Sequence, residues 1–261
     1  MKLPVFAAIA LFSSPFVIAQ TSSPALLTPG TTLPIRFDHS IDANHVHTGD
    51  AISAKTTQQV RLANGQTLPA GAHVIGHVTT ASAFSFDTTP YAKQKQSTLT
   101  IHFDSIDAKN EHLPLNVYVR AMADPITSWD ARRPKPSDED PLGTLTQIGG
   151  DQLTPSQKEI LSQEGDIVGY QHHGGAYAHL ISATGNAPSS CDATDTEQSM
   201  GLYSASACGL YGFTNVSLLE NGRAGNASTL TLVSHRDSPK IWANSTALLE
   251  VLSQGPAVVS Q

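Results

Sequence analysis

Residues 98–119 read TLTIHFDSIDAKNEHLPLNVYV, and this stretch decides the fold class of the chain. Apolar and polar residues alternate on both sides of the short polar segment Asp107–Asn110. An alternation of period two places one face of a strand in a core and the other face in water. The sequence therefore predicts two antiparallel strands, over residues 98–103 and 113–119, that pair as a hairpin.

The same alternation recurs towards both ends of the chain. Leu33, Ile35 and Phe37 alternate with polar residues or proline, and a longer polar strand is expected over residues 51–62. Pro34 has no backbone N–H, so the first strand is expected to lie at a sheet edge or to begin there. Further short strands are expected over residues 73–79, 166–170, 216–219, 230–233 and 247–252.

One helix is predicted, after a segment rich in proline and charged residues. Thr154 can cap it, Pro155 suits the first helical position, and Gln157 completes a Thr-x-x-Gln capping box. This helix is expected to end by Gly165.

The predicted fold class is therefore all-β, an antiparallel barrel or sandwich with one short helical insertion. The chain divides into a leader (1–19), an N-terminal β module (20–125), a connection with the helix (126–165) and a C-terminal β module (166–261). We expect the two modules to complete one barrel; two separate β domains are the alternative.

The first residues have the features of a secretory signal peptide. Lys2 supplies the positive start, Leu3–Ile18 is mostly apolar, and Ala19 ends a small-residue cleavage site. The apolar run is too short and too interrupted to suit a membrane span, and no second stretch approaches that length. We therefore expect an exported chain, periplasmic, outer-envelope or extracellular, without a transmembrane helix in its mature part.

The composition argues against nucleic acid as a partner. The chain has 261 residues, a formal net charge of −7, and only 14% charged residues. Binding to phosphate backbones relies on clustered basic residues, which this balance does not supply. No glycine-rich phosphate loop or dinucleotide-binding fingerprint is present.

The two cysteines, Cys191 and Cys208, both lie in the part expected to be exported. An oxidising compartment and an even number of cysteines predict a disulfide between them.

Histidines are candidate metal ligands, because imidazole binds zinc and copper well. Two groups stand out, His45 with His47, and His172 and His173 with His179. Either group would make the chain a Zn or Cu protein. The alternative is that these histidines are solvated at the surface, since neither group has the spacing of a structural zinc site.

The predicted disulfide loop contains two further candidate sites. Asp192, Asp195 and Glu197 could supply oxygen ligands to calcium, although their spacing is not that of an EF-hand. Ser204 and Ser206 lie among small residues, without the Gly-x-Ser-x-Gly turn of many serine hydrolases. The simpler readings are an exposed acidic loop and close packing beside the disulfide.

Residues 30–125 contain an ordered set of glycine, proline and aliphatic motifs. GTTLPIRF begins at Gly30, GDAISA at Gly49, LPAGAHVIGHV at Leu68, and LTIHFDSI at Leu99. This order resembles the β-barrel domain of the conjugal-transfer and type IV secretion scaffold (TrbI-like) family, and also exported bacterial β proteins of unknown function. The resemblance implies a β-barrel, and it brings no catalytic residues with it.

Three functions are compatible with the sequence. The first is an exported, non-catalytic β protein that acts in assembly or binding without a cofactor, with envelope proteins or a second copy as partner. The second is a periplasmic metal-binding protein that uses the clustered histidines. The third is a secreted hydrolase.

Overall fold

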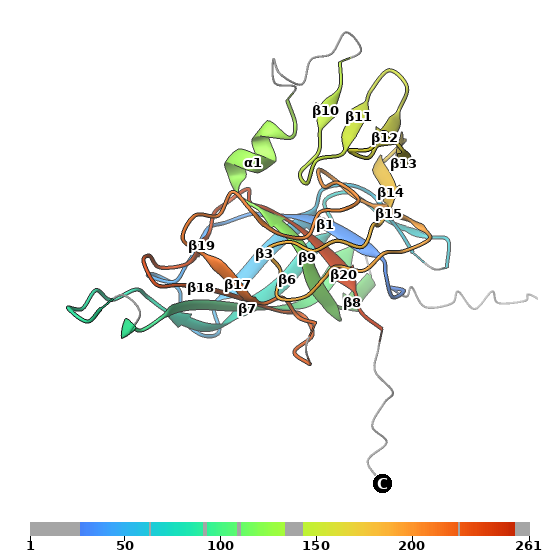
Figure 1. Ribbon diagram of the computed structural model, residues 1–261. Coiled ribbons are helices and arrows are strands. Elements are labelled where there is room, and N and C mark those ends of the chain that lie inside the picture. The colour runs from blue at the N-terminus through green and yellow to red at the C-terminus, as the bar shows by residue number, and fades with distance from the viewer. Residues whose placement is uncertain are drawn as a thin grey trace, which may run out of the picture.

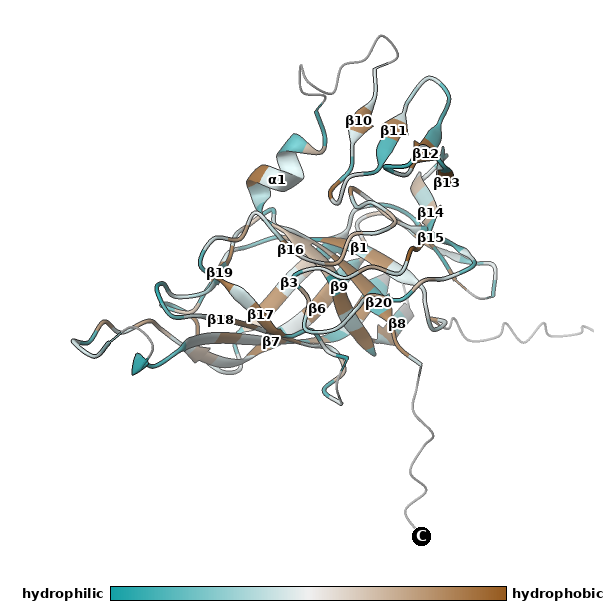
Figure 2. Cartoon of the chain, in the orientation of Figure 1, coloured by the Kyte–Doolittle hydropathy of each residue, from teal (hydrophilic) through white to brown (hydrophobic). Residues whose placement is uncertain are grey.

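The computed structural model describes residues 27–62, 64–90, 93–108, 111–133, 143–223 and 225–253. The predicted leader and part of the connection after residue 133 lie outside these ranges. Within them the protein is all-β, as predicted, and its main feature is a ten-stranded, nearly closed barrel (Figure 1). Hydrophobic residues follow the barrel strands (Figure 2).

The barrel sheet has its strands in the order β16, β9, β20, β1, β3, β6, β7, β18, β17, with β8 paired to β7. Their bounds are β16 (Gly209–Tyr211), β9 (Val117–Ala123), β20 (Thr246–Val251), β1 (Thr32–Phe37), β3 (Ala51–Thr56), β6 (His73–Ser82), β7 (Ser97–Ala108), β18 (Thr229–Ser234), β17 (Ser217–Glu220) and β8 (Glu111–Pro114). Neighbours are antiparallel, except that β16 runs parallel to β9. Strands from both ends of the sequence thus share one sheet.

The two ends of this sheet meet across backbone hydrogen bonds. The Val119 N–H donates to the Asn221 carbonyl at 2.7 Å, and the Ser228 N–H donates to the Val117 carbonyl at 2.6 Å. Closing a sheet in this way removes most of its exposed edge. The interior is filled by alternate residues of the strands, among them Leu33, Ile35, Phe37, Ile101 and Phe103.

A second, six-stranded sheet follows the chain order and packs on the outside of the barrel. Its strands are β10 (Leu145–Thr146), β11 (Gln152–Thr154), β12 (Glu159–Leu161), β13 (Ile167–His172), β14 (Gly175–His179) and β15 (Glu197–Ser199). Two short pairs complete the fold, β2 (Ile41–Asp42) with β19 (Lys240–Ile241), and β4 (Val60–Arg61) with β5 (Thr67–Leu68).

The contact between barrel and second sheet is a separate apolar cluster. Ala121, Ala123 and Leu248 face outward from β9 and β20, where they pack with Ile160 and Tyr203. Since β9 is buried along its whole length, its two faces serve two cores. The small alanines allow the second sheet to lie close to the barrel.

The prediction of a helix that begins after Thr154 is wrong. Residues 152–161 form the β11–β12 hairpin, in which Leu153 and Ile160 are cross-strand partners. The Thr154 carbonyl accepts from the Lys158 N–H at 2.7 Å, so the residues expected to begin a helix make a turn instead. Burial of Leu153 and Ile160 between the second sheet and the barrel outweighs the local capping preference.

The described part of the chain contains one α-helix, α1 (Pro125–Asp130). Asp124 caps it by accepting from the Thr127 N–H at 2.7 Å, and Pro125 occupies the first turn. No helix among the described residues has the length and apolar character needed to cross a bilayer.

The first strand is internal, which corrects the expectation of an edge. β1 lies between β20 and β3, but its pairing with β3 begins only at Ile35. The missing N–H of Pro34 therefore interrupts no ladder on that side, and its carbonyl accepts from the Thr57 N–H at 2.8 Å. The predicted strand over residues 51–62 is divided into β3 and β4, and that over residues 113–119 into β8 and β9.

Candidate ligand-binding groove

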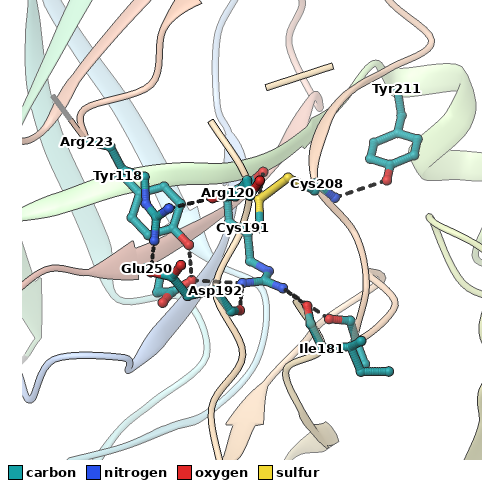
Figure 3. The surroundings of a disulfide bond; sticks show 11 residues. Tyr118, Arg120, Ile181, Cys191, Asp192, Cys208, Tyr211, Arg223 and Glu250 are labelled. Carbon is teal, nitrogen blue, oxygen red and sulfur yellow. Dashed lines mark hydrogen bonds and ion pairs between the residues drawn. A yellow bond between two sulfur atoms is a disulfide. The ribbon is translucent and has the colours of Figure 1, made fainter. Parts of the chain in front are cut away.

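The predicted disulfide is present. Cys191 and Cys208 are bonded, with their Cα atoms 5.9 Å apart, and both are buried. Figure 3 shows that this bond lies beside Arg120 of β9, a fully buried arginine. The Arg120 guanidinium donates to the carbonyls of Ile181 at 2.7 Å and Asp192 at 2.6 Å. Arg120 thus ties the disulfide-closed segment to the barrel wall.

The charge of Arg120 is balanced inside the protein. Glu250 of β20 accepts a hydrogen bond from Arg120 at 3.1 Å and another from the Tyr118 hydroxyl (Figure 3). The guanidinium of Arg223 lies over the Tyr118 ring, 4.4 Å from its centroid. Burial, followed by the neighbouring Glu250, raises the pKa of Tyr118 to about 12. This buried network has a structural role, since a lone buried charge would be strongly destabilising.

The histidines singled out from the sequence do not gather into one site. His45 and His47 have side chains 80% and 86% exposed, beside Asp42 and Asp50 respectively. His172 lies near Glu197 and the ring of Tyr177 at the β13–β14 hairpin, while His173 and His179 are exposed. Within the described ranges, no three His, Cys, Asp or Glu side chains are grouped so as to hold a metal ion.

The three carboxylates proposed for calcium do not share contacts with one another. Asp192 pairs with Arg223, and Glu197 lies near Arg61 and His172. Asp195 is exposed.

The serines beside Cys208 are not arranged as nucleophiles. Ser204 is fully buried, and its hydroxyl bonds to that of Ser206 at 3.3 Å. A substrate could not reach Ser204 without unpacking the segment around it.

A groove of about 770 Å³ lies between the barrel, the end of α1 and the second sheet. Its barrel wall comes from β1, β3 and the segment after β3, and its other wall from β10, β11 and the β13–β14 hairpin. Apolar lining is provided by Leu145, Leu153 and Leu202. A volume of this size suits a small organic ligand.

Three basic side chains line this groove. Arg36 of β1 and Lys55 of β3 are direct cross-strand partners, and Arg132 enters from the end of α1. In the described part of the chain only Lys55 has a carboxylate partner, Asp38 at 3.5 Å, and no Asp or Glu lines the groove. Partial burial, and then the positive charge of Arg36, lower the pKa of Arg132 from its ordinary value.

Neutral hydrogen-bonding groups complete the lining: Thr56, Thr57, Gln58, Gln147 and Gln171. Gln58 is buried and joins the two walls, because its amide donates to the Ala176 carbonyl at 2.9 Å and accepts from the Gly201 N–H at 2.7 Å. Gln147 is buried too, but its Oε1 has no hydrogen-bond partner among the described residues. The groove therefore offers charged donors beside neutral hydrogen-bonding groups.

Glycine is required where the hairpin approaches Gln58. Gly175 has φ +135°, and a Cβ there would lie 2.5 Å from Gln58 Oε1. Any side chain at this position would push the hairpin away from the barrel and change the groove.

No protein-family model matches this chain, and neither curated proteins nor solved structures include a match to it. The groove must therefore be interpreted from its own chemistry. Sequence reasoning missed its basic residues, because Arg36, Lys55 and Arg132 come from three distant segments.

Proposed function

We propose that this chain is an exported, non-catalytic binding protein whose groove holds a small molecule with carboxylate or phosphate groups. One observation carries the proposal: Arg36, Lys55 and Arg132 converge on a groove that has no carboxylate among the described residues of its lining, in a chain of net charge −7. Arg36 and Arg132 have no carboxylate partner among the described residues, so their positive charges repel each other, and an anion bound between them removes that repulsion.

The chemistry of the lining narrows the ligand. Guanidinium groups bind carboxylate and phosphate through paired, charge-assisted hydrogen bonds. A hydroxyl on the same ligand would bond to the exposed amide of Gln171, and an aliphatic part would contact Leu145, Leu153 and Leu202. A hydroxy acid or a sugar phosphate combines these groups.

Export is supported by the leader-like residues 1–19 and by the buried disulfide, since stable disulfides form in oxidising compartments. The absence of a catalytic role is proposed because Ser204 is buried and its hydroxyl bonds to that of Ser206. We also propose that the partner is an envelope protein or a second copy of the chain, and that residues 30–125 form a TrbI-like β-barrel domain.

Isothermal titration with citrate and with glucose 6-phosphate at low salt tests the groove. We expect the wild-type protein to bind at least one of the two, and the double variant R36Q/R132Q to bind it at least about tenfold more weakly. Arg133→Gln is the matched control, because Arg133 adjoins Arg132 but stacks on Trp129 at 4.1 Å and does not line the groove.

Equal binding by wild type and R36Q/R132Q, or no binding of either compound by the wild type, would overturn the proposal. A thermal unfolding scan of each variant shows whether the fold is retained. Should R36Q/R132Q fail to fold, Arg132→Gln alone provides the comparison, since Arg132 lies on the exposed end of α1.

A further inference from the structure

Two histidines outside the groove face each other on the barrel surface. His77 of β6 and His102 of β7 are direct partners in the antiparallel pair, and their ring centroids are 5.6 Å apart. Both side chains are partly exposed, at 40% and 34%. They are 25 positions apart in sequence, and only the sheet brings them together.

A β-bulge creates this pairing. The register between β6 and β7 shifts at Ile75/Gly76, so that Gly76 lies opposite Phe103 and His77 opposite His102. Without the shift His77 would face Phe103, whose side chain fills the barrel interior. Gly76 is needed for the close approach, because a Cβ at this position would lie 2.1 Å from the His102 carbonyl.

Each ring is held through its Nδ1 atom. His77 Nδ1 bonds to Asp104 Oδ2 at 2.9 Å, and His102 Nδ1 bonds to Thr229 Oγ1 at 3.3 Å. Partners of this kind fix the tautomer and the ring orientation of metal-binding histidines. With both Nδ1 atoms engaged, the Nε2 atoms of the two rings stay available as ligands.

We propose that His77 and His102 together bind one divalent transition-metal ion, Zn²⁺ or Cu²⁺, through their Nε2 atoms, with water completing the coordination. Two imidazoles on one tetrahedral ion, with metal–nitrogen bonds of about 2.1 Å, have ring centroids about 5 Å apart. The observed 5.6 Å is close to that separation. Asp104, 3.9 Å from His102 Nε2, adds a negative charge next to the ion.

This site needs neither the groove nor the proposed anion. It also differs from the histidine groups that the sequence suggested, which the fold leaves dispersed and exposed. A two-histidine site is compatible with the absence of any three-residue metal group in the described ranges.

Isothermal titration of the untagged protein with ZnCl₂ at pH 7.5 tests the inference. The wild type should bind one Zn²⁺ tightly, and His102→Gln should remove that binding. Thr229→Val, which leaves both ligands but frees the His102 ring, should weaken binding by about tenfold. The double variant H45Q/H47Q is the control for exposed histidines and should bind as the wild type does.

Nitrogen NMR of the imidazoles provides a second measurement. Zn²⁺ should shift the Nε2 resonances of His77 and His102, and addition of EDTA should reverse the shift, because the chelator removes the metal. The inference is overturned by undiminished Zn²⁺ binding in His102→Gln, by loss of binding in H45Q/H47Q, or by a wild type that binds no Zn²⁺.

Discussion

Arg36 and Lys55 lie opposite each other across β1 and β3, and Arg132 adds a third positive charge nearby. Like charges directly opposed on neighbouring strands lower the stability of a sheet. Natural proteins keep destabilising groups of this kind where the groups contribute to function. The proposed anion site would account for this arrangement of positive side chains.

Arg36→Gln should therefore raise the free energy of unfolding of the ligand-free protein, by about 0.2–1 kcal/mol. It should also reduce the extra stability that the bound anion gives to the wild type. Urea unfolding with and without citrate measures both effects. A ligand-free Arg36→Gln protein less stable than the wild type would contradict this view of the groove.

Tyr118 makes a second residue-level prediction, at alkaline pH. Its pKa is raised to about 12 in the folded protein, whereas an unfolded tyrosine ionises near pH 10. The folded state therefore holds this proton more tightly, and the resulting stability is complete below about pH 10 and is lost as the pH rises towards about 12.

Between about pH 10 and 12 the free energy of unfolding of the wild type should fall by about 2–3 kcal/mol more than that of Tyr118→Phe. At neutral pH the variant should be about 1 kcal/mol less stable, because the hydrogen bond to Glu250 is missing. Chemical denaturation at a series of pH values gives both numbers. Parallel curves for the two proteins above pH 10 would show that Tyr118 is not the group responsible.

Individual residues differ in how far the sequence revealed them. Cys191 and Cys208 could be paired because they are the only cysteines. Arg120 gave no signal, since its burial depends on carbonyls more than sixty residues away. His77 and His102 were equally hidden, because a bulge at Gly76 sets their register and no local pattern predicts a bulge of this kind.

At the level of elements, the disulfide and Arg120 hold the segment between β14 and β16 on the barrel. The bond closes a loop with a sequence separation of 17, which corresponds to about 3 kcal/mol of stability in the chain-entropy description. That segment contains β15, an edge strand of the second sheet.

The double variant C191S/C208S should consequently unfold with a free energy lower by about 3 kcal/mol. Amide hydrogen exchange should accelerate first in β15 and in the loop around Asp192, while the barrel strands β6 and β7 keep their protection. Mass spectrometry of exchanged peptides checks this order. Uniform acceleration over barrel and loop would mean that the disulfide supports the whole fold equally.

Strands were easier to predict than the helix, and the reason is physical. Alternation over β3 and β7 reports burial on one face, which the barrel then provides, whereas β1 and β18 are buried on both faces. The capping pattern at Thr154 reports only a local preference, and the pairing of Leu153 with Ile160 overrides it. Asp124 and Pro125, which do begin a helix, lay at the end of a predicted strand module and carried no periodic apolar pattern after them.

At the scale of the molecule, the barrel is assembled from both ends of the chain, and the second sheet is inserted between β9 and β16. The sequence placed an insertion with a helix over residues 126–165, whereas the segment between β9 and β16 is longer and contains the second sheet. The groove arises only where the inserted sheet meets the outer face of β1 and β3. No single segment of the sequence contains the groove, so no sequence motif predicts it.

Titration of ¹⁵N-labelled protein with citrate, followed through the backbone amide resonances, tests the central claim most directly. We predict that the largest shifts fall on both walls of the groove, at residues 55–58 in and after β3, at residues 174–176 of the β13–β14 hairpin and at residues 201–202 after β15. Shifts confined to other surfaces, or no shifts on saturation with the ligand, would contradict the account of this groove as an anion-binding site.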